Sequence, residues 1–135
     1  ILLKALDSAT YFLKNVEIYP NHPFTIQNLA FYYMETKNYP LAIEYFNKSL
    51  KIDSSLINSY INLAIIYLKT NKLKESEKYL QQALHFNPNN ANIYYWLGEV
   101  FRMKNDKENM CKYYQQALSL GYQSAQTAIN SYCVK

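Results

Sequence analysis

The segment that decides the fold is NLAFYY at residues 28–33, which returns as NLAIIY at 62–67 and, in altered form, as WLGEVF at 96–101. Each copy begins 34 residues after the one before it. A second landmark keeps the same step, because a small residue followed by Leu occurs at 49–50, 83–84 and 117–118. Two landmarks that share one period indicate an internal repeat, which is typical of a stacked array of similar units.

Each copy also follows the period of an α-helix, because apolar residues recur at i, i+3, i+4 and i+7 and therefore share one helix face. These residues are Ile26, Leu29, Ala30 and Tyr33, then Tyr60, Leu63, Ala64 and Tyr67, then Tyr94, Leu97, Gly98 and Phe101. Only 2 Gly and 4 Pro occur in 135 residues, which leaves few positions suited to the tight turns of β-hairpins. The sequence therefore predicts an all-α fold.

Composition narrows the class of protein further. Hydrophobic residues make up 50% of the chain and charged residues 18%, so the chain can bury a core. The net charge is +4, but Arg102 is the one arginine and the lysines are scattered, so we expect no nucleic-acid binding. No stretch approaches the roughly 18 consecutive apolar residues of a membrane span, so we expect no membrane insertion.

The pattern resembles the tetratricopeptide repeat (TPR), in which a first helix carrying these residues is followed by a second helix with its own small and aromatic positions. The matching second-helix residues are Ala42, Phe46 and Ser49, then Ser76, Leu80 and Ala83, then Met110, Tyr114 and Ala117. The resemblance implies helical hairpins stacked as a solenoid in a right-handed superhelix. We predict a single array over residues 1–135: the second helix of a partial repeat in 1–22, full repeats in 23–56, 57–90 and 91–121, and a capping helix in 122–135.

Helix ends are marked by short polar residues. Asn38 and Asp106 suit the position that caps the start of a helix, and Asn71 and Asn105 suit the left-handed conformation that ends one. These residues predict short turns between the two helices of each pair.

The two ends of the predicted array differ. Residues 1–22 supply only the second helix of a unit, so the face around Phe12 is expected to be uncovered. Either further repeats precede it in the native protein, or this face docks on a neighbour, including a second copy of the chain. At the other end an apolar stripe predicts a solubilising cap; its members are Ala125, Ala128, Ile129, Tyr132 and Cys133.

Residues suited to catalysis are scarce. His22 and His85 fall at helix ends or junctions, and the repeat register places no nucleophile or carboxylate beside them. The chain has no zinc-type spacing of Cys and His and no phosphate-binding loop. We expect a protein that is not an enzyme and that has no cofactor and no metal.

The two cysteines allow two interpretations. Cys111 and Cys133 are about equally far in sequence from the Gly121-Tyr122 turn, and an antiparallel helical hairpin would bring them level. One hypothesis is therefore a disulfide that clips the cap. The alternative is a pair of small buried hydrophobic residues in a reducing cytosol. The compartment stays open between a cytoplasmic location and, with the disulfide, an extracytoplasmic one.

The resemblance further implies a concave surface lined by the first helices, where family members typically bind peptides or helices. On this sequence the inner stripe is largely apolar or amide, and its residues are Phe31, Asn58, Ile61, Asn62, Ile65, Asn92, Tyr95, Trp96 and Glu99. We predict a groove for an apolar peptide or helix segment of a protein partner, anchored mainly by the aromatic and isoleucine side chains. The alternative is that the amides are ordinary helix-surface residues.

One subclass of the family holds the C-terminal carboxylate of chaperones with a clamp of Lys, Asn, Asn, Lys and Arg. At those positions this chain carries Gln27, Phe31, Asn62, Asn92 and Trp96. Only Asn62 matches, and every cation is missing. We therefore do not expect a chaperone tail as the ligand, and we expect binding to depend little on salt.

Overall fold

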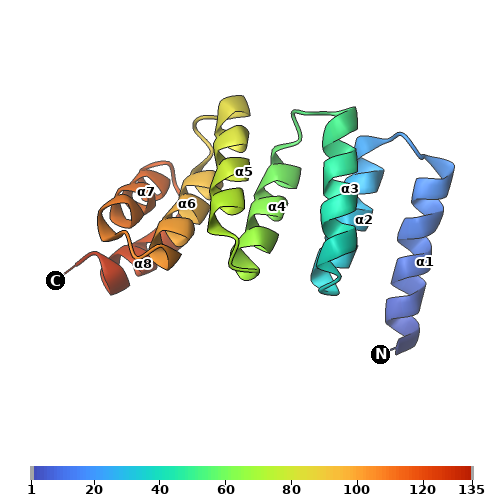
Figure 1. Ribbon diagram of the computed structural model, residues 1–135, viewed down its shortest axis with the longest axis horizontal. Helices are drawn as coiled ribbons and strands as arrows, with labels where there is room; N and C mark the ends of the chain where they lie inside the picture. The colour runs from blue at the N-terminus through green and yellow to red at the C-terminus, as the bar shows by residue number, and fades with distance from the viewer. Residues whose placement is uncertain (1, 135) are drawn as a thin grey trace. The chain divides into compact units, whose positions relative to one another are not determined.

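The computed structural model describes residues 2–134, with side chains from Ser8 onward. Over these residues the chain forms eight α-helices and no β-strand, so the predicted all-α fold is confirmed (Figure 1). The helices are α1 (Leu2–Ile18), α2 (Pro23–Glu35), α3 (Tyr39–Ile52), α4 (Ile57–Lys69), α5 (Leu73–Phe86), α6 (Ala91–Met103), α7 (Lys107–Ser119) and α8 (Ser124–Tyr132). The chain divides into two compact units, Ile1–Ile66 and Tyr67–Lys135, with the boundary inside α4.

In the first unit, α2 packs on both α1 and α3. The core of this hairpin is apolar, since Ile26 and Leu29 of α2 and Phe46 of α3 are fully buried. Two buried serines join three helices: Ser59 Oγ of α4 lies 2.9 Å from Ser49 Oγ of α3 and accepts a hydrogen bond of 2.8 Å from Gln27 Nε2 of α2. The serines are tolerated in the core because their hydroxyl groups have partners there.

In the second unit, α6 packs on both α5 and α7, and α8 packs on α7. Leu97 and Val100 of α6 and Tyr114 and Ala117 of α7 are fully buried. The contact between α6 and α7 is close at Gly98, where a Cβ atom would lie only 2.5 Å from two ring carbons of Tyr114. A glycine is therefore needed at this position because the large ring of Tyr114 faces it.

The turns within the helix pairs repeat their geometry at the same 34-residue step. Lys37, Asn71 and Asn105 have φ angles of 62°, 60° and 60°, in the left-handed region. The side chain of Asn38 accepts the backbone N–H of Leu41 at 3.5 Å, and that of Asp106 accepts the N–H of Asn109 at 3.1 Å. The predicted helix ends at Asn71 and Asn105 and the predicted caps at Asn38 and Asp106 are confirmed.

A stacked aromatic pair recurs near each of these turns, and the three pairs contain five of the chain's 15 tyrosines. The ring centroids lie 5.7 Å apart for Tyr33 and Tyr45, 5.5 Å for Tyr67 and Tyr79, and 5.4 Å for Phe101 and Tyr113. Each pair joins the first helix of a hairpin to the second. Stacked rings of this kind stabilise by up to roughly 1.5 kcal/mol beyond the area they bury.

Ile61 departs from the prediction. It is only 4% exposed, so it cannot anchor a ligand on an accessible surface, and its assignment to the groove is wrong. The reason lies in α4, whose buried residues include Tyr60, Ile61, Leu63, Ala64 and Ile66. A helix that is apolar around so much of its circumference is packed on more than one side, and Ile61 belongs to that packing.

The predicted uncovered face at the start of the chain also needs correction. Phe12 is half-buried, because its ring lies 5.6 Å from that of Tyr32 on α2. The exposed large side chains in and just after α1 are instead Tyr11, Leu13, Ile18 and Tyr19. At the other end of the chain, Ala125, Ala128 and Ile129 of α8 are buried, whereas Tyr132 is 45% exposed.

Candidate functional site

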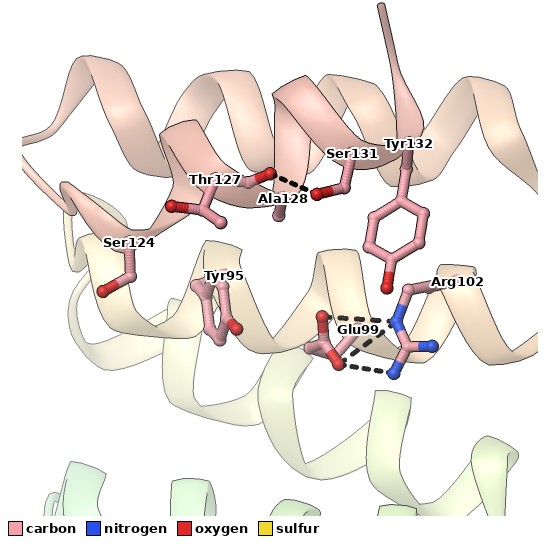
Figure 2. Close-up of a pocket in the computed structure, with 8 residues that line it drawn as sticks. All are labelled: Tyr95, Glu99, Arg102, Ser124, Thr127, Ala128, Ser131 and Tyr132. Carbon is pink, nitrogen blue, oxygen red and sulfur yellow. Dashed lines mark hydrogen bonds and ion pairs between the residues drawn. The ribbon is translucent and has the colours of Figure 1, made fainter.

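A hollow of about 460 Å³ lies between α6 and α8 in the second unit (Figure 2). The spacing of the lining residues places one face of each helix toward the hollow. They are Tyr95, Glu99 and Arg102 of α6, and Ser124, Thr127, Ala128, Ser131 and Tyr132 of α8. The hollow therefore has an aromatic and charged side on α6 and a hydroxyl-rich side on α8.

Glu99 is the electrostatic centre of the hollow. Its carboxylate accepts hydrogen bonds from Arg102 Nη2 at 2.8 Å and from Arg102 Nε at 3.3 Å, and it also accepts one from the buried hydroxyl of Tyr114. The hydrogen bond to Glu99 raises the pKa of the Arg102 guanidinium. Burial, and secondly the hydrogen bond to Glu99, raises the pKa of the Tyr114 phenol. The two charges thus neutralise each other, and the hollow has no net charge.

Aromatic contacts fix the rings around this ion pair. Tyr95 stacks on Tyr122 with centroids 4.6 Å apart and meets Trp96 edge to face at 5.6 Å. Burial is the main cause that raises the pKa of the Tyr95 phenol. Across the hollow, the guanidinium carbon of Arg102 lies 5.6 Å from the centroid of the Tyr132 ring, which extends toward it from α8 (Figure 2). Tyr95 and Arg102 are thereby held in place before any ligand arrives.

The structure brings two predicted groove residues, Tyr95 and Glu99, together in this hollow. Asn92 and Trp96 are half-buried on the same helix. The remaining predicted residues belong to the first unit, where Phe31 and Asn58 are exposed, Asn62 and Ile65 half-buried and Ile61 buried.

The sequence analysis missed Arg102 and the contribution of α8. Ser124, Thr127 and Ser131 are spaced by three and four residues, which is a helical stripe and was a readable signal. A buried tyrosine at the position of Tyr114 was a second signal, since its hydroxyl group requires a partner.

A disulfide between Cys111 and Cys133 lies beside the hollow. Their Cα atoms are 5.7 Å apart, and both residues are half-buried. The bond links the first half of α7 to the residue that follows α8. In the described range, His, Cys, Asp and Glu side chains nowhere gather in a group of three that could hold a metal ion. Of the helices described, none has the length and apolar character needed to span a bilayer.

Several solved structures have the same helical repeat fold as this chain. Solved structures with the same fold include one titled "Crystal structure of MamA", with a TM-score of 0.76 and 23% identity, covering 91% of this chain and 75% of that one. Another is YrrB, titled "a TPR protein with an unusual peptide-binding site", with a TM-score of 0.75 and 24% identity, covering 84% of this chain and 58% of that one. A further MamA structure matches with a TM-score of 0.73 and 23% identity. The match covers 83% of this chain and 61% of that one. At these identities the likeness shows the fold.

Family models give the more specific result. Two models described as tetratricopeptide repeat match residues 22–89 and residues 61–126. No curated protein matches the sequence. Tetratricopeptide proteins are generally non-catalytic scaffolds that bind protein or peptide partners. Since the first model covers half of the chain and the helices repeat at its period, this chain belongs to the tetratricopeptide repeat family.

Proposed function

We propose that this chain is a non-catalytic interaction module that binds an uncharged, mainly apolar segment of a protein partner, and that the hollow between α6 and α8 is part of its binding surface. The observation that carries the proposal is the hollow itself, which combines exposed hydroxyl groups with fixed aromatic rings and an internally neutralised ion pair. Concave surfaces that offer aromatic contact area together with oriented polar groups are common binding sites of proteins.

The chemistry of the walls supports this class of ligand. The hydroxyl groups of Ser124 and Thr127 can each donate and accept hydrogen bonds, as the backbone of an extended peptide requires. The Ser131 hydroxyl donates to the carbonyl oxygen of Thr127 at 2.9 Å, so it can only accept from a ligand. The rings of Tyr95 and Tyr132 offer contact area to apolar side chains, and tyrosine is frequent among residues that dominate binding energy. Because Glu99 and Arg102 neutralise each other, a charged ligand would find no unpaired partner there, and affinity should change little with salt.

In the first unit, taken by itself, we propose a separate contact surface that includes the exposed residues Phe31 and Asn58, with the half-buried Asn62 and Ile65. They occupy the inner-stripe positions that the family resemblance assigns. Ile61 is removed from the set because it is buried.

A substitution within α8 tests the proposal. Peptides would first be selected on the purified chain from a random peptide library, and the affinity of the strongest binder would then be measured by fluorescence anisotropy. Thr127→Lys places a long charged side chain in the hollow and should weaken binding at least about tenfold, equivalent to about 1.4 kcal/mol. Gln126→Lys is the matched control, since Gln126 is an exposed neighbour on the same helix that does not line the hollow.

The outcome is decided by comparing the two variants. Equal affinity of Thr127→Lys and Gln126→Lys, with unchanged helix content by circular dichroism, would contradict the assignment of the hollow. A steep loss of affinity with rising salt would contradict the uncharged class of ligand.

A second candidate function, self-assembly, is favoured by the exposed side chains at the start of the chain. Tyr11 and Ile18 are each 63% exposed, and Tyr19 is 57% exposed. Large apolar side chains grouped in this way are typical of docking surfaces. Light scattering should then show a mass that rises with protein concentration, and Ile18→Asp should abolish the rise. A mass equal to one chain at every concentration would exclude this function.

A further inference from the structure

α8 forms one wall of the hollow, and three of its side chains are buried against the rest of the unit. It supplies five of the eight lining residues. It has only nine residues, and no side chain caps its first turn. An isolated helix of this length is not stable in water, so α8 depends on its attachment to the rest of the unit.

The attachment is uneven along the helix. At the start, Ala125 is fully buried and Tyr122 stacks on Tyr95. At the end, Tyr132 is 45% exposed, and its ring centroid lies 5.6 Å from the guanidinium carbon of Arg102. The buried side chains of α8 are two alanines and one isoleucine, which remove little apolar area from water.

The Cys111–Cys133 disulfide is the covalent attachment at the weak end. Cys133 follows the last residue of α8, and its backbone N–H donates to the carbonyl oxygen of Ile129 at 2.8 Å. Cys111 lies on α7 beside Met110, which is buried, and one turn before Tyr114, which is fully buried. The bond therefore ties the end of a weakly held helix to a firmly packed one.

We propose that this disulfide is a redox latch that holds the last turn of α8 and, through it, the wall of the hollow. The inference rests on the proposed function where it concerns ligand binding, but its effect on α8 does not. Both cysteines are half-buried rather than fully buried, so the bond lies near the surface of the unit.

The chemistry of opening is thiol–disulfide exchange with a dithiol. A thiolate of the dithiol attacks one sulfur atom, and a mixed disulfide forms as the Cys111–Cys133 bond breaks. The second thiol of the dithiol then displaces the remaining protein sulfur. Two electrons and two protons pass to the protein, which gains two thiols, while the dithiol becomes a disulfide. The last turn of α8 then frays and carries Tyr132 away from Arg102.

Hydrogen exchange measured by mass spectrometry tests the latch, with dithiothreitol as the reductant. Reduction should speed exchange at residues 129–133 at least about tenfold and leave α7 nearly unchanged. The double variant Cys111→Ser/Cys133→Ser should exchange like the reduced chain and should not respond to dithiothreitol. Equal exchange of α8 in the oxidised and reduced chains would overturn the proposal. A second result would also overturn the proposal. In it, an alkylating reagent modifies both cysteines of a chain purified without reductant, and mild oxidation does not join them.

Peptide affinity measured on the same samples separates this inference from the proposed function. Faster exchange in α8 together with weaker binding supports the latch as a control of the hollow. Faster hydrogen exchange in α8 with unchanged peptide affinity would overturn the claim that the disulfide controls the hollow. Failure of the oxidised chain to bind any selected peptide would overturn the proposed function alone, since the exchange measurement needs no ligand.

Discussion

At the scale of single residues, the close contact between α6 and α7 depends on the sizes of two facing residues, Gly98 and Tyr114. In the last full repeat Gly98 faces Tyr114, whereas the equivalent positions carry Ala30 with Phe46 in the first repeat. The larger tyrosine needs the smaller partner, and its hydroxyl group reaches past the apolar contact to Glu99. Tyr114 therefore belongs to the core and also holds Glu99, which lines the hollow.

Gly98→Ala should destabilise the fold by about 1–3 kcal/mol, because the added methyl group would overlap the ring of Tyr114. Urea unfolding followed by circular dichroism measures the change. The double variant Gly98→Ala/Tyr114→Leu should be less unstable than the sum of its two single variants, since the smaller side chain removes the overlap. Additive effects of the two substitutions would show that the close contact is not the cause.

Tyr114 also predicts how stability depends on pH. Its pKa in the folded chain is raised above the ordinary value of 10.0, mainly by burial. Folding therefore favours the neutral phenol, so this contribution to stability is complete below about pH 10 and is lost as the pH rises toward the folded pKa. Tyr114→Phe should be less stable at neutral pH but should lose less stability on going to alkaline pH. The prediction would be contradicted if the free energy of unfolding fell by the same amount in both chains as the pH rose above about 10.

At the scale of helices and turns, the same turn geometry occurs in all three repeats, but the residue at its left-handed position differs. Lys37, Asn71 and Asn105 all adopt left-handed backbone angles, but asparagine tolerates them better than lysine does. Lys37→Asn should therefore stabilise the fold by up to about 1 kcal/mol, as measured by the midpoint of thermal unfolding. The control is Lys48→Asn, which lies exposed inside α3 and should be slightly destabilising because asparagine is the poorer helix former. Equal effects of the two substitutions would contradict the role of the turn.

Much of this level of structure was predictable from the sequence. The 34-residue period and the i, i+3, i+4, i+7 stripes depend on local spacing, so they located the helices and the residues of the core. The surface was harder, because Ile61 and Ile65 look alike in the sequence while only Ile61 is buried. The ion pair of Glu99 and Arg102 lies within one helix, but its bond to Tyr114 depends on how α6 and α7 face each other. Local spacing does not contain that information.

At the scale of the whole molecule, each of the two compact units has its own core, and the candidate site is complete within the second. The hollow, the ion pair, the aromatic rings and the disulfide all belong to residues after Tyr67. In the proposed function, α8 supplies one wall of the binding surface and α6 supplies the other. The proposed binding surface and the proposed redox latch both involve α8, the shortest helix described.

The most direct test of the central claim is a map of backbone amide chemical shifts, recorded by NMR with and without the selected peptide, on the oxidised chain. The account predicts that the largest changes fall on the two facing helices, at Tyr95, Glu99, Arg102, Thr127 and Ser131. The exposed residues of α7 on the other side of the hairpin, such as Gln115 and Gln116, should change little. Largest changes on α7 or α1, with α6 and α8 unaffected, would contradict the claim that this hollow receives the partner.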